Sequence, residues 1–188
     1  NGDDFTYIQC DLPHNAQFVP VIEVDAKAGI RITVTVGQDT NNINSTYITK
    51  DGVQRHTFPG WMNGEKVIYK IPSGWVKVLS VQYIETGYPA AFVGDFASGN
   101  ELLDTLWEKS KRTLYVTMRD TFMDCPCRER AQWPGDMVVQ LAQVPYCLDR
   151  TADGLVQKGL YETFRWQQDN GILYGPVPEG NWRMELPA

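Results

Sequence analysis

Apolar and polar residues alternate along the chain up to about residue 88, with the two-residue period of β-strands. In the segment from Ile30 to Val36 every second residue is β-branched and apolar, while arginine and threonine occupy the positions between them. β-Branched and aromatic residues are enriched in strands. Three further segments have this composition, namely 18–24, 67–71 and 75–84. We therefore expect this part of the chain to consist of short strands.

A turn signal separates two of the expected strands. Lys50-Asp-Gly52 lies between Tyr47-Ile-Thr and Val53-Gln-Arg, and glycine accepts the positive φ that hairpin turns require. Short strands separated by turns are typical of antiparallel sandwiches. We expect residues 1–90 to form an antiparallel β-sandwich module with a hairpin at Lys50–Gly52.

After Gly94 the apolar positions recur at helical spacing, which predicts three helices. The first helix is expected to start after a cap at 98–100, the second to run from Asp136 with Pro145 limiting or kinking it, and the third to start near Thr151 or Asp153 and stop at 169–171. The expected apolar stripes are Leu103, Leu106, Trp107, Ser110, Leu114 and Met118 in the first helix, Met137, Leu141 and Val144 in the second, and Val156, Leu160 and Phe164 in the third.

The three helices do not make a comfortable closed bundle, because their apolar stripes need further partners. We therefore expect residues 91–188 to be the opening helices of a larger α-helical domain, and the chain to be part of a longer protein.

Charge and composition exclude some classes of function. The chain has 188 residues, of which 43% are hydrophobic and 21% charged, and its formal net charge is -6 with no basic block. Nucleic acids and anionic membrane surfaces are recognised by clustered lysine and arginine, so neither is an expected partner. No apolar run approaches the ~18 residues that suggest a membrane span. The compartment stays open, and we favour a periplasmic or secreted location over the cytoplasm.

The candidate chemistry is concentrated in one expected loop, from Asp124 to Asp136. Hydrolysis of a glycosidic bond needs an acid for the leaving oxygen and a base that activates water. It also uses hydrogen-bonding groups for the sugar hydroxyls and commonly an aromatic wall. The candidates for these roles are three carboxylates (Asp124, Glu129, Asp136), two arginines (Arg128, Arg130) and one tryptophan (Trp133).

Simpler interpretations exist for each part of this loop. Arg128-Glu-Arg130 can be a solvated charge triplet, Asp136 can cap the second helix, and Trp133-Pro134 can be a packing corner. Cys125-Pro-Cys127 can suggest a metal site, but no second ligand pair has suitable spacing and neither histidine lies nearby. We expect no metal and no cofactor, and the four cysteines to be free thiols.

The loop closely resembles the signature of glycoside hydrolase family 78, the bacterial α-L-rhamnosidases. The matching string is Asp124-Cys125-Pro126-x-Arg128-Glu129-Arg130-x-x-Trp133-x-Gly135-Asp136. The resemblance implies an exo-acting, inverting hydrolase in which a β-sandwich precedes an (α/α) six-hairpin barrel. It implies that Glu129 is the general acid, that Arg130 is structural and that the sugar subsite consists of Asp124, Arg128, Trp133 and Asp136.

The same resemblance implies a rhamnose-containing oligosaccharide or glycoside as substrate. It also places the catalytic base far downstream, beyond Ala188. Glu162, Glu179 and Glu185 have no family match, so we expect the 188 residues alone to be inactive. Flanking arginines lower the pKa of a glutamate whereas burial and neighbouring carboxylates raise it, so the protonation of Glu129 is open at this level. Another exo-glycosidase on the same barrel and a non-catalytic carbohydrate-binding protein remain alternatives.

Overall fold

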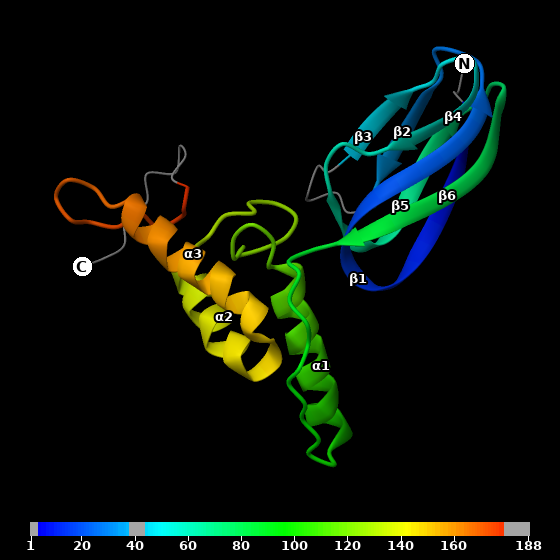
Figure 1. Ribbon diagram of the computed structural model, residues 1–188. Coiled ribbons are helices and arrows are strands. Elements are labelled where there is room, and N and C mark those ends of the chain that lie inside the picture. The colour runs from blue at the N-terminus through cyan, green and yellow to red at the C-terminus, as the bar shows by residue number, and fades with distance from the viewer. Residues whose placement is uncertain (1–3, 38–43, 179–188) are drawn as a thin grey trace. The chain divides into compact units, whose positions relative to one another are not determined.

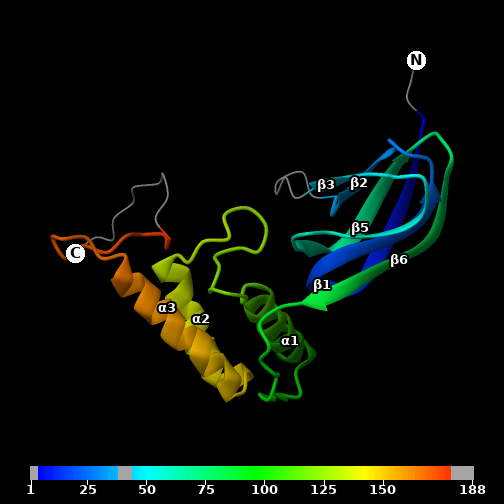
Figure 2. The same cartoon turned by 45° about the horizontal axis from the view of Figure 1, so that its top comes forward.

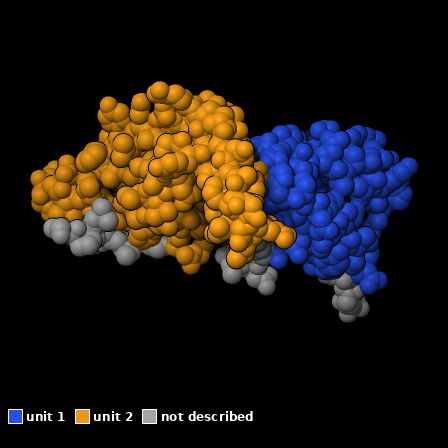
Figure 3. Space-filling view, turned by 90° about the horizontal axis from the view of Figure 1, so that it is seen from below, with its two compact units in different colours: residues 1–86 blue, residues 87–188 orange. Residues whose placement is uncertain are grey.

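A computed structural model describes residues 4–37 and 44–178 of the chain. Two compact units divide the chain, residues 1–86 and residues 87–188 (Figure 3). Within the described residues, strands β1 to β6 lie in the first unit and the helices lie in the second, so each unit is described by itself. Among the described residues no helix is both long enough and apolar enough to cross a membrane.

The first unit is an antiparallel sheet that curls on itself (Figure 1). The hydrogen-bonded order is β3-β2-β5-β1-β4, and β6 also pairs with β1. The strands are β1 (Phe5–Ala26), β2 (Arg31–Thr35), β3 (Asn44–Ile48), β4 (Gly52–Thr57), β5 (Met62–Pro72) and β6 (Val76–Thr86).

Strand β1 connects all parts of this sheet because it is 22 residues long. Its first half pairs with β5, and its second half pairs with β4 on one side and β6 on the other. An irregularity between Asp11 and Ala16 shifts the register against β5. The antiparallel pairing agrees with the sequence prediction, but the strands belong to one continuous sheet because β1 runs through both halves.

The predicted hairpin at Lys50–Gly52 is wrong. Gly52 does have a positive φ of 88°, but β3 pairs with β2 and β4 pairs with β1, so the turn joins strands that are not neighbours. The preceding residue Thr49 explains the path: its backbone bonds Gly29 and Ile30, and its hydroxyl donates to the Lys27 carbonyl at 2.5 Å. The chain is thereby held against the β1–β2 connection as it crosses between strands.

The core of the first unit follows the alternation seen in the sequence. Ile32, Val34 and Val36 are almost fully buried, as their two-residue spacing predicts. Phe18 from β1 and Tyr69 from β5 are the largest side chains in this core, and the Tyr69 hydroxyl lies 3.4 Å from the carbonyl of Val21. Burial raises the pKa of Tyr69, which keeps this phenol neutral.

The second unit contains α1 (Glu101–Val116), α2 (Pro134–Cys147), a 3₁₀ turn η1 (Arg150–Ala152) and α3 (Asp153–Arg165). The N-cap of α1 is Asn100, whose side chain accepts the amides of Leu102 and Leu103, within the predicted cap. The second helix begins two residues before the predicted start, because Pro134 occupies its first turn. Pro145 lies inside α2 and does not end it.

The third helix ends at Arg165, well before the predicted stop at 169–171. Its buried positions are Leu155, Gly159 and Thr163, one residue before the predicted stripe, while Leu160 and Phe164 are exposed. Helices α2 and α3 lie side by side (Figure 2), and the small Gly159 lets a neighbouring side chain approach this face, as described below.

The helical unit has a small core and large exposed apolar faces. Its core side chains include Leu114, Met118, Phe122, Met137 and Leu155. Apolar side chains on all three helices remain exposed, namely Leu102, Leu103 and Leu106 on α1, Val138, Val139 and Tyr146 on α2, and Leu160, Tyr161 and Phe164 on α3. This exposure agrees with the expectation that the helical stripes need further partners.

Candidate functional site

The candidate site lies in the connection between α1 and α2, residues 117–133. Two buried glutamines hold this connection at its two ends. Gln140 from α2 holds the beginning, because its Nε2 donates to the Thr117 hydroxyl at 3.0 Å and to the Met123 carbonyl at 2.7 Å. Gln140 is 9% exposed, so these hydrogen bonds are shielded from water and stabilise one path of the chain.

Gln132 holds the other end of the connection. Its Oε1 accepts the Thr121 hydroxyl at 2.8 Å, and its Nε2 donates to the Gly159 carbonyl at 2.9 Å and to the Thr163 hydroxyl at 3.2 Å. A Cβ at Gly159 would lie 3.1 Å from the Gln132 Oε1, so the glycine makes this approach possible. The backbone of Gln132 also pairs with Val177 in both directions, at 3.0 and 2.9 Å.

Sequence reasoning missed both glutamines. Gln140 stands three residues after Met137 and four before Val144, on the buried face of α2. An amide side chain on the apolar stripe of a helix indicates a buried hydrogen bond, since buried polar groups are normally hydrogen-bonded. This signal could have identified Gln140. Gln132 had no comparable signal, because its partners on α3 are distant in the sequence.

Between these two anchors the chain makes a tight reversal. The Asp124 amide donates to the Ala131 carbonyl at 3.0 Å, and the Ala131 amide returns a hydrogen bond to Asp124 Oδ1 at 3.1 Å. Arg130 has a φ of 55°, uncommon for a residue with a side chain. Its Nε donates to the Pro126 carbonyl at 3.0 Å, and the structural role expected for Arg130 stays a prediction.

This reversal brings Glu129 back toward Asp124. Side-chain oxygens of the two residues lie within 4.8 Å of each other. The Arg128 Nη2 donates to Glu129 Oε1 at 2.6 Å, with the Glu129 side chain 13% exposed and the Arg128 side chain 68% exposed. The Glu129 carboxyl is therefore largely shielded from solvent, which rules out a fully solvated charge triplet.

The pKa of Glu129 is raised above its ordinary value. A hydrogen bond with the Asp124 carboxyl is the main cause, burial adds to it, and the negative charge of Asp124 acts in the same direction. The hydrogen bond and charge of Arg128 oppose this shift without reversing it. The balance left open by the sequence therefore falls on the side of a raised pKa, which is the direction that a general acid requires.

Trp133 and Asp136 lie at the beginning of α2 rather than in the reversal. Trp133 is the N-cap residue, with extended backbone and no side-chain capping hydrogen bond. Asp136 falls in the first turn of α2, so it does not cap the helix, although its charge is favourable at a helix N-terminus. The structure thus brings Asp124, Arg128 and Glu129 together in the loop. Trp133 and Asp136 lie outside this cluster, at the N-terminal end of α2.

Three residues of this cluster could serve as ligands of a metal ion. Among the described residues, Asp124, Cys125 and Glu129 each offer one ligand atom within 4.8 Å of the others. Structural zinc sites take four protein ligands. The Cys125 sulfur already accepts the Glu129 amide at 3.4 Å, and Glu129 is paired with Arg128. The expectation that no metal is bound stays a prediction.

The geometry of this loop defines a class of protein. An antiparallel β unit precedes helices whose connecting loop holds a shielded glutamate of raised pKa beside a second carboxylate and an arginine. A glutamate whose pKa is raised by a neighbouring carboxylate, beside an arginine that can hydrogen-bond sugar hydroxyls, is an arrangement typical of glycoside hydrolases.

The family model of the bacterial alpha-L-rhamnosidase 6 hairpin glycosidase domain matches residues 91–187. This match spans just over half of the chain, and the chain belongs to that family. A comparison with curated proteins found no match.

Solved rhamnosidases share the fold. A glycoside hydrolase family 78 rhamnosidase of Bacillus sp. GL1 matches with a TM-score of 0.82 and 25% identity, over 95% of this chain and 20% of that chain. A rhamnosidase from Klebsiella oxytoca with rhamnose bound matches with a TM-score of 0.79 and 14% identity, over 99% of this chain and 40% of that one. The chain therefore spans less than half the length of these structures.

Proposed function

We propose that this chain carries the general acid and part of the sugar subsite of an inverting α-L-rhamnosidase, with Glu129 as the acid. The observation that supports the proposal most directly is the shielded contact of Glu129 with Asp124, which raises the pKa of Glu129. In the proposed reaction Glu129 gives its proton to the glycosidic oxygen as the bond to the leaving group breaks. A base elsewhere removes a proton from the attacking water.

Asp124 is too close to Glu129 to be that base. Inverting glycosidases separate the acid and the base by roughly 6.5–9.5 Å to admit a water, whereas oxygens of Asp124 and Glu129 lie within 4.8 Å. We therefore assign to Asp124 the role of raising the pKa of Glu129, together with a contact to a sugar hydroxyl. Glu162, Glu179 and Glu185 have no family match as the base, and the last two lie outside the described residues. We therefore propose that another part of the complete enzyme supplies the base.

The remaining motif residues are proposed to hold the sugar. The exposed guanidinium of Arg128 and the carboxylates of Asp124 and Asp136 suit sugar hydroxyls through charge-assisted hydrogen bonds. Trp133 offers an aromatic wall for one ring face. In this proposal residues 1–90 are the β module and residues 91–188 are the opening helices of the six-hairpin barrel. The substrate is a glycoside with a terminal α-L-rhamnose.

The acid role has a specific test in the complete enzyme. Glu129→Gln is expected to lower kcat on an unactivated rhamnoside by roughly 10²–10⁴-fold. The same variant should lose much less activity on α-L-rhamnosyl fluoride, because fluoride departs without protonation. Glu108→Gln, which changes an exposed glutamate on α1 paired with Lys111, is the matched control and should retain activity on both substrates.

Three results would contradict the proposal. Near-normal activity of Glu129→Gln on the unactivated rhamnoside would exclude the acid role. If NMR shows that the rhamnose released first keeps the anomeric configuration of the substrate, the inverting mechanism is excluded. Binding of L-rhamnose by the wild-type enzyme without turnover of any rhamnoside would favour a non-catalytic carbohydrate-binding protein. For the 188-residue chain alone we expect no appreciable hydrolysis.

A further inference from the structure

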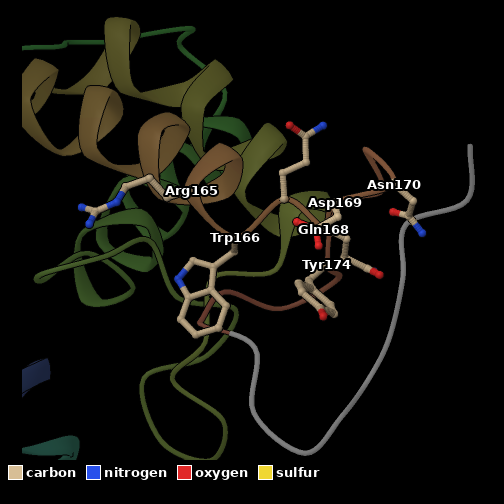
Figure 4. A pocket seen from close by; sticks show the side chains of 7 residues that line it. Arg165, Trp166, Gln168, Asp169, Asn170 and Tyr174 are labelled. Carbon is tan, nitrogen blue, oxygen red and sulfur yellow. The ribbon is translucent and has the colours of Figure 1, made fainter.

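A second concave site lies at the end of α3, outside the motif. It is a hollow of about 550 Å³ formed by the last turn of the helix and the loop that follows. Figure 4 shows Arg165 at one end and Asn170 at the other, with Trp166 and Tyr174 between them. The lining residues are Arg165, Trp166, Gln167, Gln168, Asp169, Asn170 and Tyr174.

The loop around this hollow is held by its own hydrogen bonds. The Gln168 amide donates to the Ile172 carbonyl at 2.9 Å, and the Gly171 amide returns a bond to the Gln168 carbonyl at 2.8 Å. The Gln167 side chain donates to the Gly171 carbonyl at 2.7 Å. The Trp166 amide bonds the Glu162 carbonyl at the end of α3. The aromatic ring of Trp166 is therefore attached to a braced turn.

Several polar groups of the hollow have no partner among the described residues. The Asp169 carboxylate, the Tyr174 hydroxyl and the Trp166 indole N–H make no hydrogen bond within residues 4–37 and 44–178. Arg165 is paired with Glu162 at 3.4 Å, so Asp169 is the lining carboxylate that can accept hydrogen bonds from the hydroxyls of a ligand. Aromatic faces beside open donors and acceptors suit a neutral polyhydroxylated ligand.

The hollow lies at the same end of the helices as the motif. The motif loop leaves the C-terminal end of α1, and the loop 166–178 leaves the C-terminal end of α3. The two loops are joined by the backbone pair of Gln132 and Val177. The Gln132 side chain also bonds Gly159 and Thr163, on the last two turns of α3. Gln132 therefore holds both the motif loop and the end of α3 that carries Trp166.

We propose that this hollow is a second sugar subsite, which binds the sugar unit linked to the terminal rhamnose on the leaving-group side. The inference rests on the proposed function, because it takes Glu129 as the group that protonates the bond between the two sugars. Trp166 supplies the stacking face, and Asp169 and Tyr174 bind hydroxyls. The substrate class is accordingly a rhamnosyl oligosaccharide rather than a rhamnoside with a small leaving group.

The kinetic test compares two substrates in the complete enzyme. One is a disaccharide in which α-L-rhamnose is linked to glucose, and the other is α-L-rhamnosyl fluoride, whose leaving group is a single atom. A stacking contact of about 1.4 kcal/mol corresponds to tenfold in affinity. Trp166→Ala should therefore lower kcat/KM on the disaccharide about tenfold more than on the fluoride. Gln157→Ala, which changes an exposed polar residue on α3 that does not line the hollow, is the control and should change neither value.

A binding test separates failure of this subsite from failure of the proposed function. In the Glu129→Gln background, calorimetry should show that Trp166→Ala weakens binding of the disaccharide about tenfold more than binding of L-rhamnose. An equal effect on the two ligands, or none, would overturn the subsite even if the enzyme is a rhamnosidase. If the wild-type enzyme hydrolyses no rhamnoside but the binding difference is seen, the proposed hydrolysis fails and the subsite stands.

Discussion

The clamp that Gln132 forms between the motif loop and α3 allows a quantitative prediction. Gln132 is 1% exposed and makes three side-chain hydrogen bonds, to Thr121, Gly159 and Thr163. Gln132→Met keeps a side chain of similar length but removes every donor and acceptor. The change therefore isolates the hydrogen bonds from the packing.

The expected loss follows from these three bonds. Each contributes about 0.5–1.5 kcal/mol net, which sets a range of about 1.5–4.5 kcal/mol for the three. The Thr163 hydroxyl and the Gly159 carbonyl keep a hydrogen bond with each other, and the methionine gains apolar burial. Both effects reduce the cost, so we expect Gln132→Met to lower the free energy of unfolding by about 2–3 kcal/mol.

The assay is urea denaturation of the chain, followed at the helical band of the circular dichroism spectrum. Gln157→Met is the matched control, because Gln157 is an exposed glutamine on α3, and surface substitutions usually stay within about 0.5 kcal/mol. In the complete enzyme Gln132→Met should also lower kcat, since a misplaced acid loses its alignment. If Gln132→Met had the same unfolding free energy as Gln157→Met, the hydrogen bonds of Gln132 would not stabilise the fold and the prediction would be refuted.

The remaining predictions concern the pKa of Glu129 and the cap of α1. Asp124→Asn removes the carboxyl whose hydrogen bond and charge raise the pKa of Glu129, so the alkaline limb of kcat/KM should move to lower pH. Arg128→Met removes the group that lowers this pKa, so the same limb should move to higher pH. Shifts in the same direction for both variants would contradict the assignment. Asn100→Ala removes two capping hydrogen bonds of α1 and should cost about 1 kcal/mol of unfolding free energy, measured by urea denaturation.

The raised pKa also fixes the sign of one contribution to stability. A carboxyl whose pKa is higher in the folded state binds its proton more tightly there than in the unfolded chain. Glu129 therefore favours folding at acid pH. This contribution is lost as the pH rises from the ordinary glutamate pKa through the raised one. Most paired carboxylates have the opposite sign, so Glu129 reduces stability near neutral pH, a cost consistent with a functional site.

Sequence periodicity located the elements better than it located their partners. The alternation from Ile30 to Val36 and the cap at Asn100 depend on neighbouring residues, and both agree with the structure. Strand β1 extends well before the predicted segment 18–24, because its pairing with β5 begins at Phe5 and continues across the register shift between Asp11 and Ala16. The wrong hairpin at Gly52 has a similar cause. A local turn preference predicts that the chain bends at Gly52, but it does not predict which strands pair. The pairing of β4 with β1 depends on residues about thirty positions away.

The candidate site shows the same division between local and distant causes. The residue types of the motif indicate acid and sugar-binding chemistry, but the protonation of Glu129 depends on the direction in which each charged group points. The reversal from Asp124 to Ala131 turns Glu129 toward Asp124, and Gln132 and Gln140 hold both ends of that reversal. A loop held only by its own contacts would let Glu129 turn toward water, where its pKa would return to the ordinary value. The chemistry in the motif thus depends on two neutral amides that take no part in it.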